Sequence, residues 1–288
     1  MPLPNPSSII TMLPLEEIHP HEEYDPQILL KITNSLLTEE AVHDPLLVSS
    51  DNFVILDGTH RYWALARLGC KSVPVAIYDY NTNQVDIGCW YRCLDKAPDL
   101  NLPSFVRGGK ISKREGLRAV RERKALFAMV YEDSSYAAIS ESFDIFEAYS
   151  LLSFFEQGLR GRGHKLTYAT ENDAMAKLEA GEIGAILASP PIRKEEVVLA
   201  GTTGRLFPLK SSRHIINSRP IGLNVPLEWL CQGAKSSEKR LKSLISRGTF
   251  RHLPSGSVVN ERRYEEEVYI FELGSFGGGH DSGDRDKG

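Results

Sequence analysis

The feature that most constrains the fold is the segment at residues 53–75, FVILDGTHRYWALARLGCKSVPV. An apolar run at 53–56 ends abruptly at residues 57–61, DGTHR; a helical pattern then runs to Gly69, and a second apolar run follows. Short apolar runs bounded by turn residues are typical of buried strands, and glycine commonly ends a helix. The segment therefore predicts a strand–turn–helix–strand unit with polar side chains where the first strand ends.

The residue types in this turn indicate an anion site. The first N–H groups of a helix lack intrahelical partners and carry the positive end of its dipole. Gly58 lets the backbone approach a ligand, Thr59 can cap the helix, and His60 and Arg61 add donors. Asp57 fits if a divalent cation bridges it to phosphates, or if it orients His60. Two interpretations remain: a nucleotide phosphate site with Mg²⁺, or a ligand-free Asp57–Arg61 lock.

Composition limits the classes of protein. The 288 residues are 41% hydrophobic and 25% charged, with a net charge of −4, which is typical of a globular protein and makes a nucleic-acid partner unlikely on this criterion. No apolar run reaches 18 residues, and the N-terminus lacks the pattern of a signal peptide, so we expect a cytoplasmic protein without a membrane span. The four cysteines lack the paired spacings of a zinc site, so we expect free thiols.

The remaining patterns predict an α+β chain in four parts. We expect a domain at 1–100 that holds the candidate nucleotide site, a helical insertion at 101–163, a second α+β part at 164–273 and a disordered tail at 274–288. The family resemblance described below implies that the 164–273 part binds the substrate. Helical periodicity at 27–40, 114–155, 171–182 and 236–248 predicts helices, and apolar runs at 45–50, 165–170, 183–189 and 265–273 predict strands. Residues 100–116, with glycines, proline and basic residues, are interpreted as a linker.

The stretch ILDGTHRYWALARLGCKSVPV resembles the signature of the ParB/sulfiredoxin superfamily, in which this turn holds nucleotide phosphates. The resemblance covers roughly residues 13–95. Sulfiredoxins carry a reactive cysteine directly before the His-Arg pair, where this chain has Thr59, so a thiolate nucleophile is absent there. ParB proteins add an arginine-rich box and a helix-turn-helix domain. No such box is found, and the basic KREGLRAVRERK is followed by an acidic segment that we expect to pack against it.

A third branch, the free L-serine kinases, matches two further stretches. IHPHEEYDP resembles the place where these kinases carry a His-Glu pair with the proposed catalytic base, which implies Glu22, with Glu23 as the alternative. The stretch from KLTYATEND to SSRHII resembles their C-terminal half, whose Arg-His turn binds the amino acid. The resemblance therefore implies substrate contacts from Ser212, Arg213 and His214.

The resemblance also implies the activity. It indicates a ParB/sulfiredoxin-like kinase that phosphorylates free L-serine to O-phosphoserine, with Mg²⁺ and ATP or ADP as donor. Asp57 is the second candidate base, residues 58–61 are expected to contact the nucleotide, and Trp90 matches a substrate-pocket position. The alternative is a non-catalytic ParB-like switch that binds nucleotide and DNA or a protein partner. The oligomeric state and any further metal ligands are not indicated, and no P-loop pattern is present.

Each site residue also has a simpler interpretation. Glu22 lies among other carboxylates and could belong to a solvated loop. Arg213 could be an ordinary surface arginine, although its planar guanidinium suits a substrate carboxylate. His214 could be a buried structural histidine, and Trp90 could belong to the core.

Overall fold

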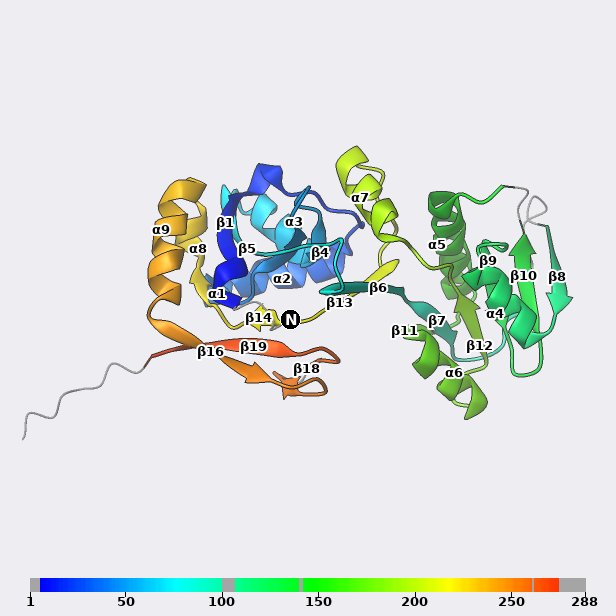
Figure 1. Ribbon diagram of the computed structural model, residues 1–288. Helices are drawn as coiled ribbons and strands as arrows, with labels where there is room; N and C mark the ends of the chain where they lie inside the picture. The colour runs from blue at the N-terminus through cyan, green and yellow to red at the C-terminus, as the bar shows by residue number, and fades with distance from the viewer. Residues whose placement is uncertain (1–5, 100–106, 140–141, 261, 275–288) are drawn as a thin grey trace, which may run out of the picture.

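The predicted strand–turn–helix unit forms part of a four-stranded sheet in the first of two lobes (Figure 1). The computed structural model describes residues 6–99, 107–139, 142–260 and 262–274. The strand order is β1-β5-β3-β4, with β3 parallel to β5 and the other neighbours antiparallel. These strands are β1 Ile10–Pro14, β3 Leu46–Ser49, β4 Ile55–Asp57 and β5 Ser72–Tyr78.

The helices of this lobe begin and end as their sequences dictate. The N-cap of α2 (Pro26–Glu39) is Asp25, whose side chain accepts from the backbone amides of Gln27 and Ile28. Helix α3 (Thr59–Arg67) is followed by Gly69 at φ 72°, a left-handed conformation that glycine adopts without strain. Helix α3 packs against α2. The first turn of α3 is thereby fixed at the end of β4.

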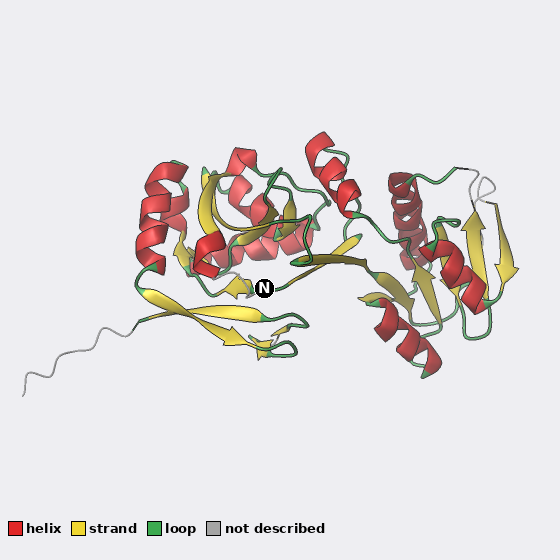
Figure 2. Cartoon of the chain, viewed as in Figure 1, coloured by secondary structure: helices red, strands yellow, loops and turns green. Residues whose placement is uncertain are grey.

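The second lobe contains a six-stranded sheet of order β11-β7-β12-β9-β10-β8, antiparallel throughout (Figure 2). Alternate residues of β9 face opposite sides, as a strand requires: Phe127 and Met129 join the cluster that includes α5, whereas Ala128 and Val130 join that of α4 and α6. Helix α5 therefore covers one face, and α4 and α6 the other. The elements are β7 Tyr91–Leu94, β8 Arg107–Ile111, α4 Lys113–Arg121, β9 Phe127–Val130, β10 Ser135–Ile139, α5 Ile145–Gly161, β11 Leu166–Ala169, α6 Glu171–Glu179 and β12 Ala185–Ala188.

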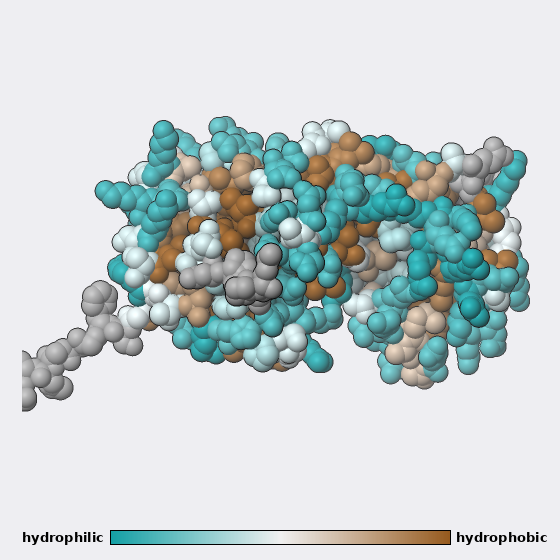
Figure 3. Space-filling model, viewed as in Figure 1, coloured by the Kyte–Doolittle hydropathy of each residue, from teal (hydrophilic) through white to brown (hydrophobic). Residues whose placement is uncertain are grey.

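A two-stranded ribbon and one helix connect the lobes. Strand β6 (Val85–Cys89) pairs with β13 (Ser212–Ile216), and β6 leads through Trp90 directly into β7 of the second lobe. Helix α7 (Lys194–Thr203) returns the chain and packs closely on Val54, the residue before β4, since a Cβ at Gly201 would lie 2.7 Å from the Val54 side chain. The space-filling view shows the two lobes with a notch between their lower edges (Figure 3).

The last described elements lie beside the first lobe. Helix α9 packs on β1, and a three-stranded sheet of order β14-β19-β16 lies beneath it (Figure 1). None of the described helices is both long enough and apolar enough to cross a membrane. The remaining elements are α1 Pro6–Ile9, a 3₁₀ turn Leu15–Glu17, β2 Ala41–Val42, β14 Arg219–Ile221, β15 Val225–Pro226, α8 Leu227–Leu230, α9 Ala234–Ile245, β16 Gly248–Leu253, β17 Val258–Val259, β18 Arg262–Arg263 and β19 Val268–Leu273.

The α+β class is confirmed, but the helical insertion is wrong. Helices α4 and α5 are separated by β9 and β10, and residues 107–116 of the expected linker form β8 and the first turn of α4. The apolar run at 125–131 fits a strand as well as a helix, and pairing with β12 decides for the strand. Residues 101–106 of the insertion and 275–288 of the tail lie outside the described residues. The domain boundaries stay a prediction.

Candidate active site

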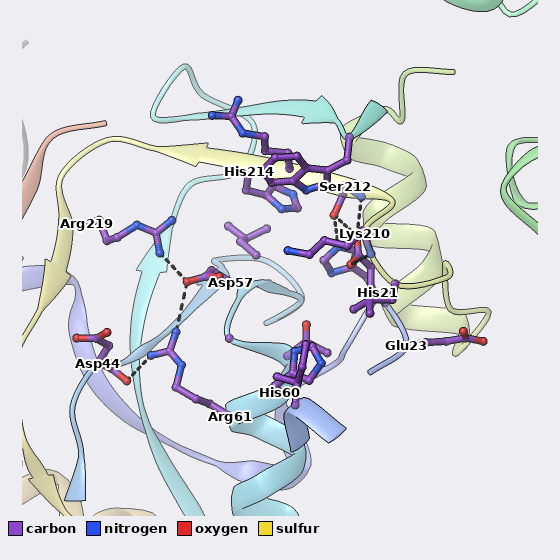
Figure 4. A pocket seen from close by; sticks show the side chains of 18 of the residues that line it. His21, Glu23, Asp44, Asp57, His60, Arg61, Lys210, Ser212, His214 and Arg219 are labelled. Carbon is purple, nitrogen blue, oxygen red and sulfur yellow. Dashed lines mark hydrogen bonds and ion pairs between the residues drawn. The ribbon is translucent and has the colours of Figure 1, made fainter. Parts of the chain in front are cut away.

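All ten predicted site residues lie along one cavity of about 560 Å³. Its walls come from the chain after β1, the turn between β4 and α3, the β6–β7 junction, the segment leading into β13, and the segment before β19. The predicted residues are Glu22, Asp57, Gly58, Thr59, His60, Arg61, Trp90, Ser212, Arg213 and His214. Segments far apart in the sequence therefore meet at one place, as Figure 4 shows for the labelled side chains.

The turn at the start of α3 presents backbone amides to the cavity. Gly58 occupies the N-cap at φ 105°, and a Cβ there would lie 2.5 Å from Leu46 Cδ2, so only glycine fits. The backbone amide of Tyr62 donates to the carbonyl of Gly58 at 2.9 Å, the first bond of the helix. The amides of residues 59–61 precede that bond and are available to a ligand. Thr59 is the first helical residue, so the expectation that it caps α3 is wrong.

His60 has a defined tautomer. Its Nε2 accepts a hydrogen bond from the backbone amide of Asp25 at 2.9 Å, so the ring proton of the neutral form is on Nδ1. Burial lowers the pKa of His60, and the nearby Lys210 ammonium lowers it further, against the opposing effect of Asp25. His60 is therefore a neutral donor beside the first turn of α3.

Asp57 is held between two guanidinium groups. Its Oδ2 accepts from Arg219 Nη1 at 2.6 Å and from Arg61 Nη2 at 3.3 Å (Figure 4). Arg61 Nη1 also donates to the backbone carbonyls of residues 44 and 45, and Arg219 Nε donates to Glu266 at 2.9 Å. Burial alone would lower the pKa of Arg219, but the carboxylates of Asp57 and Glu266 raise it overall. The Asp57–Arg61 lock considered from the sequence is thus present, and both arginines have carboxylate partners.

Glu22 faces the segment that leads into β13. Its Oε1 accepts from the backbone amide and the hydroxyl of Ser212 at 2.5 and 2.6 Å, and its Oε2 from the amide of Lys210 at 3.3 Å. The backbone is fixed because Phe207 bonds to His21 and Glu23 on either side of Glu22. Glu23 is exposed and points away from Asp57 and Ser212 in Figure 4. Glu22, rather than its neighbour, is therefore oriented toward the reaction space, with Oε2 the less engaged oxygen.

Two cations lie over the Trp90 ring. Lys210 Nζ and Arg213 Cζ are 5.2 and 5.4 Å from its centroid, and Arg213 also donates to Glu265. Such contacts stabilise a cation without neutralising it. In Figure 4 the Lys210 side chain extends toward the space between Asp57 and Ser212. Trp90 is half-buried and forms a wall of the cavity rather than part of the core.

Two histidines, the buried His21 and the half-buried His214, form the back of the cavity. His21 Nε2 lies 2.7 Å from Ser212 Oγ, His214 Nε2 lies 2.7 Å from the Tyr80 hydroxyl, and the two rings meet edge to face at 5.4 Å. Burial lowers the pKa of His21 and lowers that of His214 well below its usual value. Both are therefore neutral. His214 is bonded within the protein, as a structural histidine would be, and also lines the cavity.

A buried polar network supports Trp90 from the second lobe. Arg92 Nη1 donates to the Trp90 carbonyl at 2.6 Å, while Arg92 Nε donates to Glu156, whose other oxygen accepts from the Tyr168 hydroxyl at 2.8 Å. The Arg92 side chain is 1% exposed and that of Glu156 10%. Ser189 Oγ also donates to the Trp90 carbonyl, at 3.0 Å. The backbone at the β6–β7 junction is therefore fixed on one side of the cavity.

The sequence analysis missed several lining residues, including five charged ones that bear on the arrangement described above. Lys210 lies two positions before Ser212 and could have been found from its place in the same polar turn. The other four are brought in by chain segments that no local pattern connects to the site: Asp44, Arg219, Glu265 and Glu266.

Known proteins resemble the chain over most of its length, although no protein-family model matches it. It is 26% identical over 232 residues to an ATP-dependent L-serine kinase of Staphylothermus marinus, covering 76% of this chain and 90% of that one. It is 27% identical over 226 residues to the ADP-dependent L-serine kinase SerK of Thermococcus kodakarensis, covering 75% and 90%. A solved free serine kinase in complex with AMP superposes with a TM-score of 0.66 at 26% identity, covering 77% and 93%.

The chain is a homologue of the free L-serine kinases. The resemblance inferred from ILDGTHRYW, HPHEE and SSRHII is thereby confirmed. The helix-turn-helix of a ParB protein has no counterpart in the described part of 107–161, because two sheet strands separate α4 from α5. The roles of individual residues in this free serine kinase homologue stay predictions.

Proposed function

We propose that this chain transfers a phosphoryl group from ATP or ADP to the hydroxyl of free L-serine, giving O-phospho-L-serine. The observation that carries the proposal is that Glu22 and the free first turn of α3 face the same cavity. A base and a phosphate site must lie close together for direct transfer, because most of the catalysis in phosphoryl transfer is positioning and charge stabilisation.

The nucleotide end is assigned to the first turn of α3. The amides of residues 59–61 and Nδ1–H of His60 donate to phosphate oxygens, as helix N-termini commonly do. Arg61 holds the turn in shape through Asp57 and two carbonyls rather than binding phosphate itself. Gly58 has no side chain that could obstruct the approach of phosphate to these amides.

The chemical step is assigned to Glu22 and Lys210. Glu22 Oε2 accepts the proton of the substrate hydroxyl while the oxygen forms a bond to the terminal phosphorus and the bond to the leaving nucleotide oxygen breaks. The Lys210 ammonium stabilises charge on the transferring group, since it makes no ion pair in the described structure and points into the cavity. Arg213 binds the substrate carboxylate, with Ser212 holding Glu22 in place.

Magnesium fits beside this arrangement. Mg²⁺ is usually held by one or two carboxylates together with substrate phosphates, and Asp57 is the carboxylate that immediately precedes the first turn of α3. Among the described residues no cluster of three acidic, histidine or cysteine side chains could hold a metal alone, so the phosphates would supply most of the ligands. When bound, the ion would neutralise phosphate charge.

Phosphorus NMR tests the proposal directly. The full chain is incubated with Mg²⁺, a panel of free hydroxy amino acids and either ATP or ADP. We expect O-phosphoserine from L-serine, and the donor arm that yields it identifies the nucleotide. A protein that binds nucleotide in calorimetry but phosphorylates no amino acid with either donor would contradict the kinase and favour the switch.

A further inference from the structure

The pair formed by Arg213 and Glu265 lies where a free amino acid would place its two main-chain charges. We propose that this pair recognises the zwitterion: Arg213 binds the carboxylate and Glu265 binds the α-ammonium group. The inference rests on the proposed function and concerns how that site selects free amino acids over other alcohols. Nothing in the sequence patterns pointed to Glu265.

The two residues come from different parts of the fold. Arg213 lies on β13 next to Ser212, and Glu265 lies between β18 and β19, 52 residues later. Their side chains are 16% and 54% exposed, and both line the cavity. Glu265 therefore stands at the open side of the cavity, within reach of whatever Arg213 binds.

Glu23 lines the cavity, but its exposed side chain points away from Ser212 in Figure 4. The remaining carboxylates that line the cavity, apart from Glu265, are already engaged. Glu22 accepts three hydrogen bonds, and Asp57 and Glu266 are paired with Arg219. Asp44 Oδ1 accepts from the backbone amide of Gly222 at 2.9 Å, on the Arg61 side of the cavity, where Figure 4 shows it well away from Ser212.

Glu265 differs from these carboxylates in its bonding. In the described structure its one ion pair is with Arg213, the residue assigned to the substrate carboxylate. It is therefore the acid that substrate binding would leave without a partner, unless the substrate supplies a cation.

A zwitterionic ligand can replace both partners of this ion pair. Its carboxylate replaces Glu265 on Arg213, and its ammonium group binds Glu265, so each protein charge keeps an opposite charge. Buried or half-buried charges without partners are costly, which disfavours ligands that lack either group. Two classes are rejected on this basis: alcohols with a carboxylate but no ammonium, and seryl residues within a peptide.

Calorimetric binding of L-serine and 3-hydroxypropionate, which is serine without its amino group, tests the pair. Glu265→Gln should weaken binding of L-serine about ten- to 150-fold, the usual effect of losing a charge-assisted hydrogen bond. It should not weaken binding of 3-hydroxypropionate, and should strengthen it, because that ligand no longer leaves a glutamate charge without a partner. Glu267→Gln is the matched control: it lies two positions away, is paired with His252 and is absent from the cavity wall. It should change neither ligand.

A purely positioning role gives a different result. If Glu265 only orients Arg213, Glu265→Gln weakens both ligands alike, and adding it to Arg213→Gln weakens L-serine no further; either result overturns the inference. If Glu265 binds the ammonium group directly, the losses of L-serine affinity in the two single variants should roughly add in the double variant. This comparison requires only L-serine as ligand. Unchanged binding of L-serine in Glu265→Gln also overturns it.

The same measurements separate failure of the inference from failure of the proposed function. If the wild-type chain binds no free amino acid in calorimetry and phosphorylates none, both are wrong. If it phosphorylates L-serine but Glu265→Gln is unaffected, the kinase stands and the zwitterion pair is wrong.

Discussion

The two ends of the cavity differ in how their charges are satisfied. At the β4–α3 turn, Asp57 is bonded to Arg61 and Arg219, and Arg61 also holds two backbone carbonyls. At the opposite turn, the Lys210 ammonium lies over the Trp90 ring and makes no ion pair in the described structure, and Arg213 pairs with a half-exposed glutamate. The first end is rigid and supplies backbone amides; the second has cations able to exchange partners.

From this difference we expect that a charged residue of a motif can shape the binding site without contacting the ligand. A phosphate can be bound by amides that a glycine exposes, while the arginine beside it keeps the loop in shape. The cations with the strongest case for touching substrates are those that the folded protein leaves without a fixed carboxylate.

The largest effect is expected at Glu22, which faces both ends. Glu22→Gln keeps the hydrogen bonds to Ser212 but cannot accept the substrate proton. We expect kcat to fall about 10²–10⁴-fold, with kcat/KM falling in parallel and both substrates still binding. Steady-state kinetics checks this, and Glu23→Gln is the neighbouring control. A Glu22→Gln enzyme with near-normal kcat would remove the assigned base.

The next effect tests whether the unpaired cation stabilises the transition state. Lys210→Met keeps an apolar contact with Trp90 but removes the charge, and kcat should fall about 10²–10³-fold, as for loss of a transition-state donor. Lys194→Met is the matched control, because Lys194 Nζ lies 5.2 Å from the Tyr80 ring without lining the cavity. Equal kinetics for both variants would mean that Lys210 is structural.

A third pair of variants separates the two roles within the rigid turn. Arg61→Ala should lower the free energy of unfolding by about 1–3 kcal/mol, since it leaves two carbonyls and a carboxylate with fewer donors. His60→Ala should instead weaken nucleotide binding about two- to tenfold, through one lost neutral donor. Chemical denaturation and nucleotide calorimetry distinguish the two. If Arg61→Ala loses nucleotide affinity without losing stability, the arginine binds phosphate after all.

The smallest effect concerns pH. His214 has a folded pKa well below its ordinary value of about 6.5, so the unfolded chain binds more protons in acid. Stability should be full above about pH 6.5 and fall below it, by up to about 1.4 kcal/mol per pH unit until the folded pKa is reached. Denaturation at pH 7.5, 6.5 and 5.5 measures this slope.

Two histidine variants test which residue causes the change of unfolding free energy with pH. His214→Gln removes one titrating ring and should reduce the slope, leaving the part that comes from His21 and His60, whose pKa values are also lowered. The exposed His252 provides the control, and His252→Gln should leave the slope as in the wild type. An unchanged slope in His214→Gln would show that another group dominates.

The first lobe could be predicted because its signals are local. The strand, glycine turn and helix at 53–75 are contiguous, and their side chains need no distant partner to adopt this arrangement. In the second lobe, the prediction of helix was wrong at 125–139. An apolar run there is compatible with either a strand or a helix, and only pairing within the sheet selects the strand. The hairpin turn at 131–134, closed by Tyr131 and Ser134, was the overlooked local signal.

The site was predictable to the same extent. Glu22, the α3 turn and the 212–214 turn were found because the family motifs mark them. Arg219 and Glu265 were not, because their role arises only when the chain returns to the first lobe and brings them to Asp57 and Arg213. Such pairings depend on tertiary contacts that no single stretch of sequence contains.

The buried Arg92–Glu156 pair restricts how this sequence can diverge. Removing one partner of a buried ion pair typically costs about 3–5 kcal/mol, a large share of the roughly 5–15 kcal/mol that stabilises a typical domain. Replacing both partners together by apolar residues can be neutral. A lineage that drops this pair must therefore change both positions almost at once or pass through a poorly folded intermediate, so the two residues should be kept or lost together.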